Sequence, residues 1–150
     1  MTTNIHIQAE DFDVGEEIEA LTADQVQAGA VASFVGLVRG GDGLAALTLE
    51  HYPGMTEREI AKIAAEAQAR WRLGGITVIH RVGRLAVGAR IVLVAVAAAH
   101  RGSAFQACEF LMDYLKTRAP FWKQEDRGAG SEWVEARPSD DDAAERWRKR

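Results

Sequence analysis

Cysteine is nearly absent from this sequence. The single cysteine, Cys108, cannot form a disulfide within the chain, and no positively charged segment followed by an apolar one opens the chain. These two features predict a protein of the reducing cytoplasm. Long apolar runs are also missing, because the longest, residues 91–99, has about half the length that a membrane-spanning helix needs. The sequence therefore predicts no membrane span.

An excess of positive charge is missing as well. The chain has 22 acidic and 18 basic side chains, and its formal net charge is -4. The overall field of such a protein does not draw it to nucleic acid or to an anionic membrane, so any anion site must be a local cluster of cations. The 150 residues are 47% hydrophobic, which fits one globular domain over residues 1–150.

Ligand spacings typical of metal sites are absent too. The four histidines, His6, His51, His80 and His100, show no short-range spacing, and one cysteine gives no thiolate cluster. We therefore expect no metal. Cys108 falls on the apolar stripe of a predicted helix, where its thiol should be buried and protonated, so it is a poor candidate for a nucleophile.

Strand patterns dominate the first third of the chain. Residues 4–8 alternate polar and apolar side chains as in a strand, and Asp13 predicts the N-cap of a short helix. Residues 29–38 are small, apolar and β-branched, which is typical of a buried strand. Arg39 follows this strand, before a flexible glycine-rich turn. Residues 44–52 resume strand alternation, and we expect the two strands to form a long hairpin pair.

A helix is predicted next. Thr56 and Glu59 have the spacing of a capping box that opens it, and Gly74 and Gly75 predict its end.

Two further strands follow that helix. Residues 76–82 predict one strand, and residues 83–89 predict a turn-rich connector. Residues 90–99 are nearly all apolar, which is typical of a strand buried on both faces.

A second long helix lies between residues 100 and 120. Ser103 and Gln106 have the spacing of a capping box, and Pro120 predicts that the helix ends just before it. The chain should then leave in extended form. The period of two in a strand puts three of its side chains on one face: Phe121, Lys123 and Glu125.

The end of the chain predicts a hairpin and a charged tail. Residues 121–125 and 132–136 flank a glycine-containing loop, so we expect them to pair. The tail from about residue 138 begins with aspartates and ends with basic residues, an order that suits a helix dipole. It has few apolar anchors, and we expect it to be ordered only against a partner.

Several cations fall where predicted elements end. Arg39, His100 and Arg101 each follow a strand, while Lys116 and Lys123 flank the corner at the proline. Clustered cations repel one another, so a fold that gathers them favours an anion such as phosphate. The alternative is that each is an ordinary surface cation. His100 could be a ligand, a proton carrier or a histidine hydrogen-bonded to backbone at a strand end.

Four large apolar side chains lie in the same stretches. They could line an apolar pocket or belong to the ordinary core: Phe34, Met112, Phe121 and Trp122.

Four segments carry a resemblance to a known family. LTLEHYPGMTE (residues 47–57), VIHRVG (78–83), AHRGSAF (99–105) and MDYLKTRAPFWK (112–123) closely resemble the large, catalytic subunit of molybdopterin synthase. The resemblance covers nearly the whole chain, from about residue 14 to the tail. It implies an α+β fold, an α/β-hammerhead with an additional small antiparallel β-sheet.

The resemblance also implies a sulfurtransferase reaction. In that family two sulfurs are inserted into cyclic pyranopterin monophosphate to make the dithiolene of molybdopterin, with no permanently bound cofactor. The sulfur donor is the thiocarboxylated Gly-Gly end of a small ubiquitin-like partner. The family forms a homodimer of large subunits within a heterotetramer. The alternative is a non-catalytic scaffold that keeps the fold and the partner groove, and an unrelated enzyme of a phosphorylated metabolite is a further rival.

The resemblance assigns roles to individual residues. It implies that Lys116 lies beside the thiocarboxylate, that Lys123 holds the pterin or its phosphate, and that both are catalytic. His100 and Arg101 are expected to serve the pocket of the neighbouring protomer, and Arg137 matches a further arginine near the site. The full set of implied substrate contacts is Leu37, Val38, Arg39, His100, Arg101, Lys116, Lys123, Gln124 and Glu125.

Two departures from the family affect these substrate contacts. The glycine-rich loop at residues 40–43 is shorter than is usual, and Gln124 stands where another cation is common.

Overall fold

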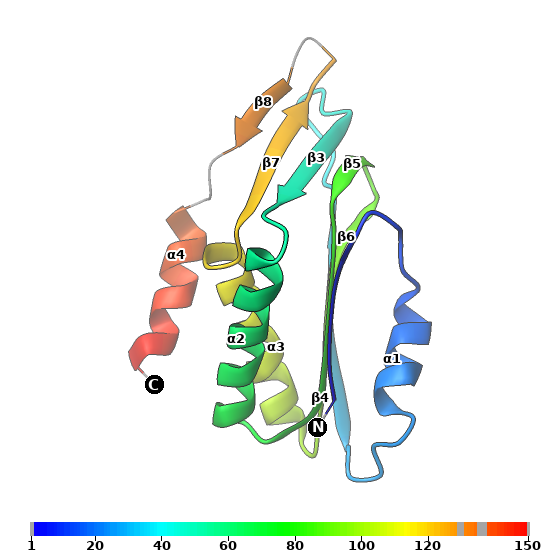
Figure 1. Ribbon diagram of the computed structural model, residues 1–150, viewed down its shortest axis with the longest axis vertical. Coiled ribbons are helices and arrows are strands. Elements are labelled where there is room, and N and C mark those ends of the chain that lie inside the picture. The colour runs from blue at the N-terminus through cyan, green and yellow to red at the C-terminus, as the bar shows by residue number, and fades with distance from the viewer. Residues whose placement is uncertain (1, 129–130, 135–137, 150) are drawn as a thin grey trace.

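The computed structural model describes residues 2–128, 131–134 and 138–149, and it has an α+β fold with two four-stranded sheets (Figure 1). Sheet A has the order β1-β4-β6-β2, and β1 runs parallel to β4 while the other pairs are antiparallel. Its strands are β1 (Thr2–Gln8), β4 (Leu73–Arg81), β6 (Arg90–Ala98) and β2 (Ala30–Leu37).

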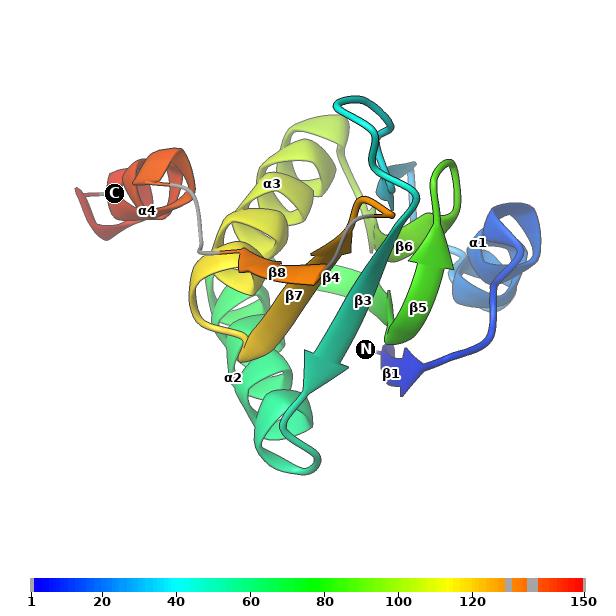
Figure 2. The same ribbon diagram turned by 90° about the horizontal axis from the view of Figure 1, so that it is seen from above.

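Sheet B is smaller and wholly antiparallel, with the order β5-β3-β7-β8. Its strands are β5 (Gly83–Ala86), β3 (Ala46–His51), β7 (Phe121–Asp126) and β8 (Ser131–Val134). Viewed from above in Figure 2, sheet B lies across one end of sheet A. The α+β class and the additional small antiparallel sheet expected from the sequence are confirmed.

Helices cover both faces of sheet A. One face carries α1 (Val14–Thr22), and the other carries α2 (Met55–Arg70) and α3 (Arg101–Thr117) (Figure 1). On β6, alternate side chains therefore enter different clusters: Val94 and Val96 pack with α2 and α3, while Leu93 and Ala95 pack toward α1. This double burial explains the continuous apolar run of β6 and confirms the predicted strand.

The predicted hairpin of residues 29–38 with 44–52 is wrong. Strand β2 pairs with β6 in sheet A, whereas β3 pairs with β5 and β7 in sheet B. Between them Gly41, Asp42 and Gly43 all have positive φ angles, a conformation that turns the chain from one sheet to the other. The connector predicted at residues 83–89 is also wrong in part, because β5 lies within it.

Both long helices begin earlier than their predicted capping boxes. Helix α2 has Gly54 as its N-cap, and the Gly54 N–H donates to Glu57 (3.1 Å). The Thr56 hydroxyl instead accepts from Tyr52 N–H and donates to the Pro120 carbonyl, each at 3.0 Å. Helix α2 ends at Arg70, and the glycines expected to end it lie within β4.

Helix α3 follows the same pattern. Its N-cap is His100, which makes no side-chain capping bond, so the box at Ser103 and Gln106 is wrong. Gln106 instead accepts a hydrogen bond from the Trp71 indole N–H (3.0 Å). The predicted end of the helix before Pro120 is confirmed, since α3 ends at Thr117.

The charged tail packs on its own chain, contrary to the expectation that only a partner orders it. Helix α4 (Pro138–Glu145) is followed by a short 3₁₀ turn, η1 (Arg146–Lys149). Trp147 is only 2% exposed and makes edge contacts with Phe110 and Trp71 of the core. Arg146 pairs with Asp113 (2.7 Å) on α3. One buried tryptophan thus supplies the anchor that the composition of the tail did not suggest.

The predicted terminal hairpin is confirmed over the described residues. Strand β7 pairs with β8, while the end of the predicted second strand, at residues 135–136, lies outside the described residues. No helix in the described ranges is both long and apolar enough to cross a membrane.

Candidate functional site

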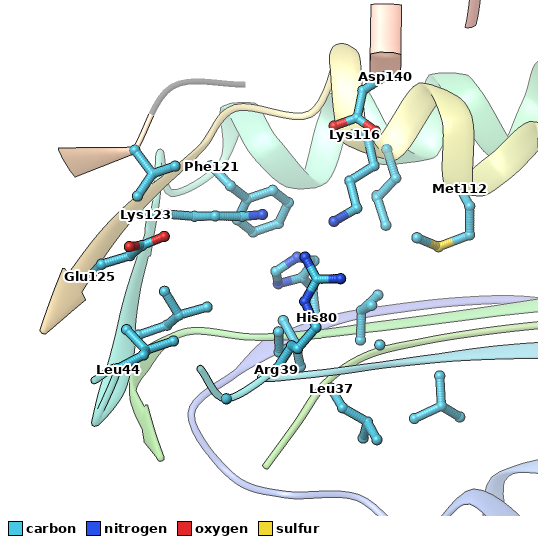
Figure 3. A pocket seen from close by; sticks show the side chains of 18 of the residues that line it. Leu37, Arg39, Leu44, His80, Met112, Lys116, Phe121, Lys123, Glu125 and Asp140 are labelled. Atoms are coloured by element: carbon cyan, nitrogen blue, oxygen red, sulfur yellow. The ribbon is translucent and has the colours of Figure 1, made fainter. Parts of the chain in front are cut away.

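A cavity of about 710 Å³ opens where sheet A, sheet B and the end of α3 meet. Its floor is formed by the ends of β2, β4 and β6, one wall by α3, and the other by β7. Figure 3 shows side chains from these elements pointing into it. The side chains that line it include Phe34, Leu37, Arg39, Leu44, Leu47, His80, Met112, Lys116, Phe121, Lys123, Glu125, Arg127 and Asp140.

Besides Arg127, which pairs with Glu125, three cations line this cavity, each from a different part of the chain. Lys116 extends from the last turn of α3, Lys123 from the inner face of β7, and Arg39 from the chain just after β2 (Figure 3). The predicted alternation of β7 is confirmed, because Phe121, Lys123 and Glu125 all line the cavity. Cations gathered in a concave site favour an anionic ligand, with the arginine able to bind phosphate through two donors.

His80 is a cavity residue that the sequence reasoning missed. It lies on the inner face of β4 and is 8% exposed, and its ring stacks on Phe121 with centroids 3.8 Å apart. Its Nδ1 lies 2.9 Å from the Arg81 carbonyl, which can only accept, so Nδ1 carries the proton. One signal was present in the sequence: His80 follows Ile76 and Val78 at the period of two and therefore shares their face of the strand.

The imidazole of His80 is neutral. Burial lowers its pKa from 6.5 to about 4, since the charged form is poorly solvated there. The nearby ammonium groups of Lys116 and Lys123, together with His51, lower it further, while the hydrogen bond to Arg81 opposes them. The ring therefore offers an uncharged acceptor among cations.

One carboxylate on the cavity wall is neutralised by a neighbour. Glu125 forms an ion pair with Arg127, which lies just after the end of β7. The guanidinium of Arg127 also donates to the carbonyl of Asp42 (2.7 Å) and, more weakly, to that of Gly41 (3.5 Å). This contact, which we call the Arg127 clasp, ties the glycine-rich loop after Arg39 to the rim of the cavity.

Several predicted contacts lie elsewhere. Val38 is 2% exposed and packs on Leu49 and Leu85, and Gln124 lies on the outer face of β7. His100 and Arg101 are exposed at the beginning of α3, whereas Lys116 is near its end. Arg101 and Lys116 are fifteen positions apart in the helix, or about 22 Å along its axis. Arg137 lies outside the described residues.

The apolar candidates divide in the same way. Phe34, Met112 and Phe121 line the cavity, whereas Trp122 is on the outer face of β7 and is 47% exposed.

Cys108 has the environment expected of it. Its thiol is buried between α3 and sheet A, 3.8 Å from the carbonyl of Val94. Burial, together with the charge of Glu109, raises the pKa of the thiol to about 11. A thiol in this state is neither a thiolate nucleophile nor accessible from the cavity. No cluster of three or more metal-ligating side chains occurs among the described residues.

Comparisons with known proteins give a consistent result. The family model described as MoaE protein matches residues 7–118. The molybdopterin synthase catalytic subunit of Mesorhizobium japonicum is 58% identical, over 99% of this chain and 95% of the relative. The one from Escherichia coli is 56% identical, over 97% of this chain and 98% of the relative. The structure of the molybdopterin biosynthesis MoaE protein from Burkholderia ambifaria is 54% identical with a TM-score of 0.85, covering 98% of each chain.

Proposed function

The chain belongs to the MoaE protein family, and on this basis we propose that it is the catalytic subunit of a molybdopterin synthase. In the proposed reaction it transfers two sulfurs to cyclic pyranopterin monophosphate and so forms the molybdopterin dithiolene. The observation that carries the proposal is the convergence of Lys116, Lys123 and Arg39 on one cavity. That cavity, of about 710 Å³, is in the range of small-molecule sites.

We assign each cation a role according to its position in the cavity. We assign Lys116, at the end of α3, to the sulfur donor, where its ammonium stabilises the charge that develops on the carbonyl oxygen or transfers a proton. We assign Lys123 and Arg39 to the pterin phosphate, for which an arginine supplies paired donors and a lysine a point charge. Leu37, Phe34 and Met112 provide apolar wall for the heterocycle.

The sulfur comes from a partner in this proposal. Cys108 is buried and protonated, so it is unsuited to carry sulfur to the cavity. We propose as donor the thiocarboxylated Gly-Gly end of a small ubiquitin-like protein, whose extended, anionic end suits a cationic cavity. No resident cofactor or metal takes part. We place the reaction in the cytoplasm, where a lone thiol stays reduced.

The assembly completes the site. We propose a dimer of this chain with one small partner at each outer end, as the family resemblance implies. His100 and Arg101, about 22 Å from Lys116 along α3, would then serve the cavity of the neighbouring protomer.

Replacement of Lys116 tests the proposed function. Lys116→Ala should lower product formation by at least about 100-fold, the usual effect of losing a preorganised donor for a developing oxyanion. Binding of the thiocarboxylated partner should persist, because its interface extends beyond one ammonium. Product is measured in single-turnover assays with the thiocarboxylated partner, and partner binding by calorimetry.

Lys62→Ala is the matched control, since Lys62 is a well-exposed lysine on α2 that does not line the cavity. Full turnover by Lys116→Ala would refute the assignment. A wild-type chain that binds the partner but forms no product would favour the non-catalytic scaffold.

A further inference from the structure

His80 has one ring nitrogen whose bonding capacity is unused. Nδ1 donates to the Arg81 carbonyl, and no hydrogen bond within the described part of the chain involves Nε2. The residue is 8% exposed, so Nε2 reaches solvent only through the cavity that the ring lines. Nε2 is not one of the fully buried polar atoms that lack a partner in the described residues, so it is open to the cavity and free to accept from a ligand that supplies the donor.

Two contacts hold the His80 ring in one orientation. Phe121 stacks on one face of it, 3.8 Å away and tilted by 16°, and the bond from Nδ1 fixes its rotation. Figure 3 places the ring at the base of the cavity, facing the side chains of Lys116 and Lys123. The edge that carries Nε2 is thus held in place before any ligand arrives, which reduces the entropic cost of binding.

The chemistry of Nε2 differs from that of the other polar groups nearby. Lys116, Lys123 and Arg39 can only donate, and the carboxylate of Glu125 is engaged by Arg127. The other carboxylates that line the cavity, Asp42 and Asp140, are charged acceptors, whereas Nε2 is an uncharged one. The cyclic phosphate of the proposed substrate is a diester, so at neutral pH it offers only acceptor oxygens and gains nothing from Nε2. The N–H groups of a heterocycle such as a pterin are the donors that fit an uncharged acceptor.

We propose that His80 is a substrate-binding residue, and that its Nε2 accepts a hydrogen bond from an N–H group of the pterin while the cations hold the phosphate. This inference rests on the proposed function and deepens it, because it separates recognition of the heterocycle from recognition of the anion. His80 contributes to specificity: phosphorylated compounds without an N–H donor at that place lose this contact.

Two substitutions separate the two nitrogens of the ring. His80→Asn keeps an amide N–H that can reach the Arg81 carbonyl but removes the acceptor at the Nε2 position. His80→Gln puts an amide oxygen near that position. Both remove the ring that stacks on Phe121, so each is the control of the other. The measurements are KM for cyclic pyranopterin monophosphate and the inhibition constant of inorganic sulfate, an anion with no donor at neutral pH.

We expect His80→Asn to raise KM about tenfold, since the substrate donor is left unpaired in a buried site. His80→Gln should stay within about threefold of the wild type, and the sulfate inhibition constant should be unchanged in both. An unchanged KM in His80→Asn would overturn the inference. So would equal increases of KM in the two variants, because these would indicate a role of the ring rather than of its acceptor.

Histidine ¹⁵N NMR of the wild-type protein gives a readout that does not depend on the variants folding. The resonance of unprotonated Nε2 should shift when the pterin substrate binds and should move much less with inorganic sulfate. Equal shifts with both ligands would contradict the inference. A wild-type chain that forms no product at all refutes the proposed function instead, so the two failures are distinguishable.

Discussion

At the scale of single residues, His80 links protonation to folding. Its pKa is about 4 in the folded chain and 6.5 ordinarily, with burial as the main cause. Below pH 6.5 the unfolded chain therefore binds a proton that the folded chain does not, and this favours unfolding. The contribution of His80 to stability is complete above pH 6.5 and is lost as the pH falls toward 4.

This linkage predicts a pH-dependent difference between the wild type and His80→Gln. From pH 7 to pH 4.5 the free energy of unfolding of the wild type should fall by about 2 to 3 kcal/mol more than that of the variant. Urea unfolding at the two pH values measures both differences. The same decrease in the two proteins would mean that His80 is protonated in the folded state at pH 4.5.

Single residues also show which parts of the site can be predicted from the sequence. The alternation after Pro120 correctly predicted that Lys123 and Glu125 share a face with Phe121, because a strand has a fixed period of two. His80 was considered only as a metal ligand and was missed. Its importance depends on the stacking with Phe121, 41 residues away in the chain, and on a strand end that faces a cavity. No local spacing reports such a contact.

At the scale of elements, the Arg127 clasp fixes the loop that follows Arg39. Three consecutive loop residues have positive φ angles, and the hydrogen bonds from Arg127 to the carbonyls of Gly41 and Asp42 restrict the conformation of this loop. The same guanidinium neutralises Glu125 inside a cavity lined by cations. Its removal would both loosen the loop and expose a negative charge to the substrate.

Arg127→Gln should therefore lower kcat/KM about fivefold, an effect equal to about 1 kcal/mol, with most of the change in KM. Arg84→Gln is the matched control. Arg84 pairs with Asp126 (3.2 Å) on the outer face of the same sheet, away from the cavity. Steady-state kinetics of the two variants measure kcat/KM. An equal decrease of kcat/KM in both variants would assign the effect to the stability of the hairpin rather than to the Arg127 clasp.

Elements themselves were predicted better than their pairing. The spacing of hydrophobic residues correctly predicted β6, α3 and β7. In these elements the buried side chains recur at a period that can be read from the sequence alone. The pairing of β2 with β3 was wrong, since neighbouring strands form a hairpin only if the turn permits it. The capping box at Thr56 was wrong because that hydroxyl bonds to Pro120, 64 residues away. Tertiary contacts replaced local ones in both cases.

At the scale of the whole molecule, the cavity lies where two sheets and a helix end meet, and one chain supplies only part of the predicted contacts. Lys116 and Arg101 belong to the same helix but to its opposite ends, about 22 Å apart along the axis. A rigid helix of this length cannot bring both to one small substrate. Both can contact one substrate only if Arg101 comes from a second copy of the chain.

This geometry predicts complementation between two inactive variants. In a dimer of Lys116→Ala with Arg101→Ala, one cavity receives both defects and the other receives both native side chains. Random mixing makes half of the dimers mixed, so about a quarter of the wild-type activity should return. Co-refolding equal amounts of the two variants and assaying product with the thiocarboxylated partner measures it. If Arg101 instead acted within its own protomer, every cavity would carry one defect, and the mixture would remain as inactive as its parents.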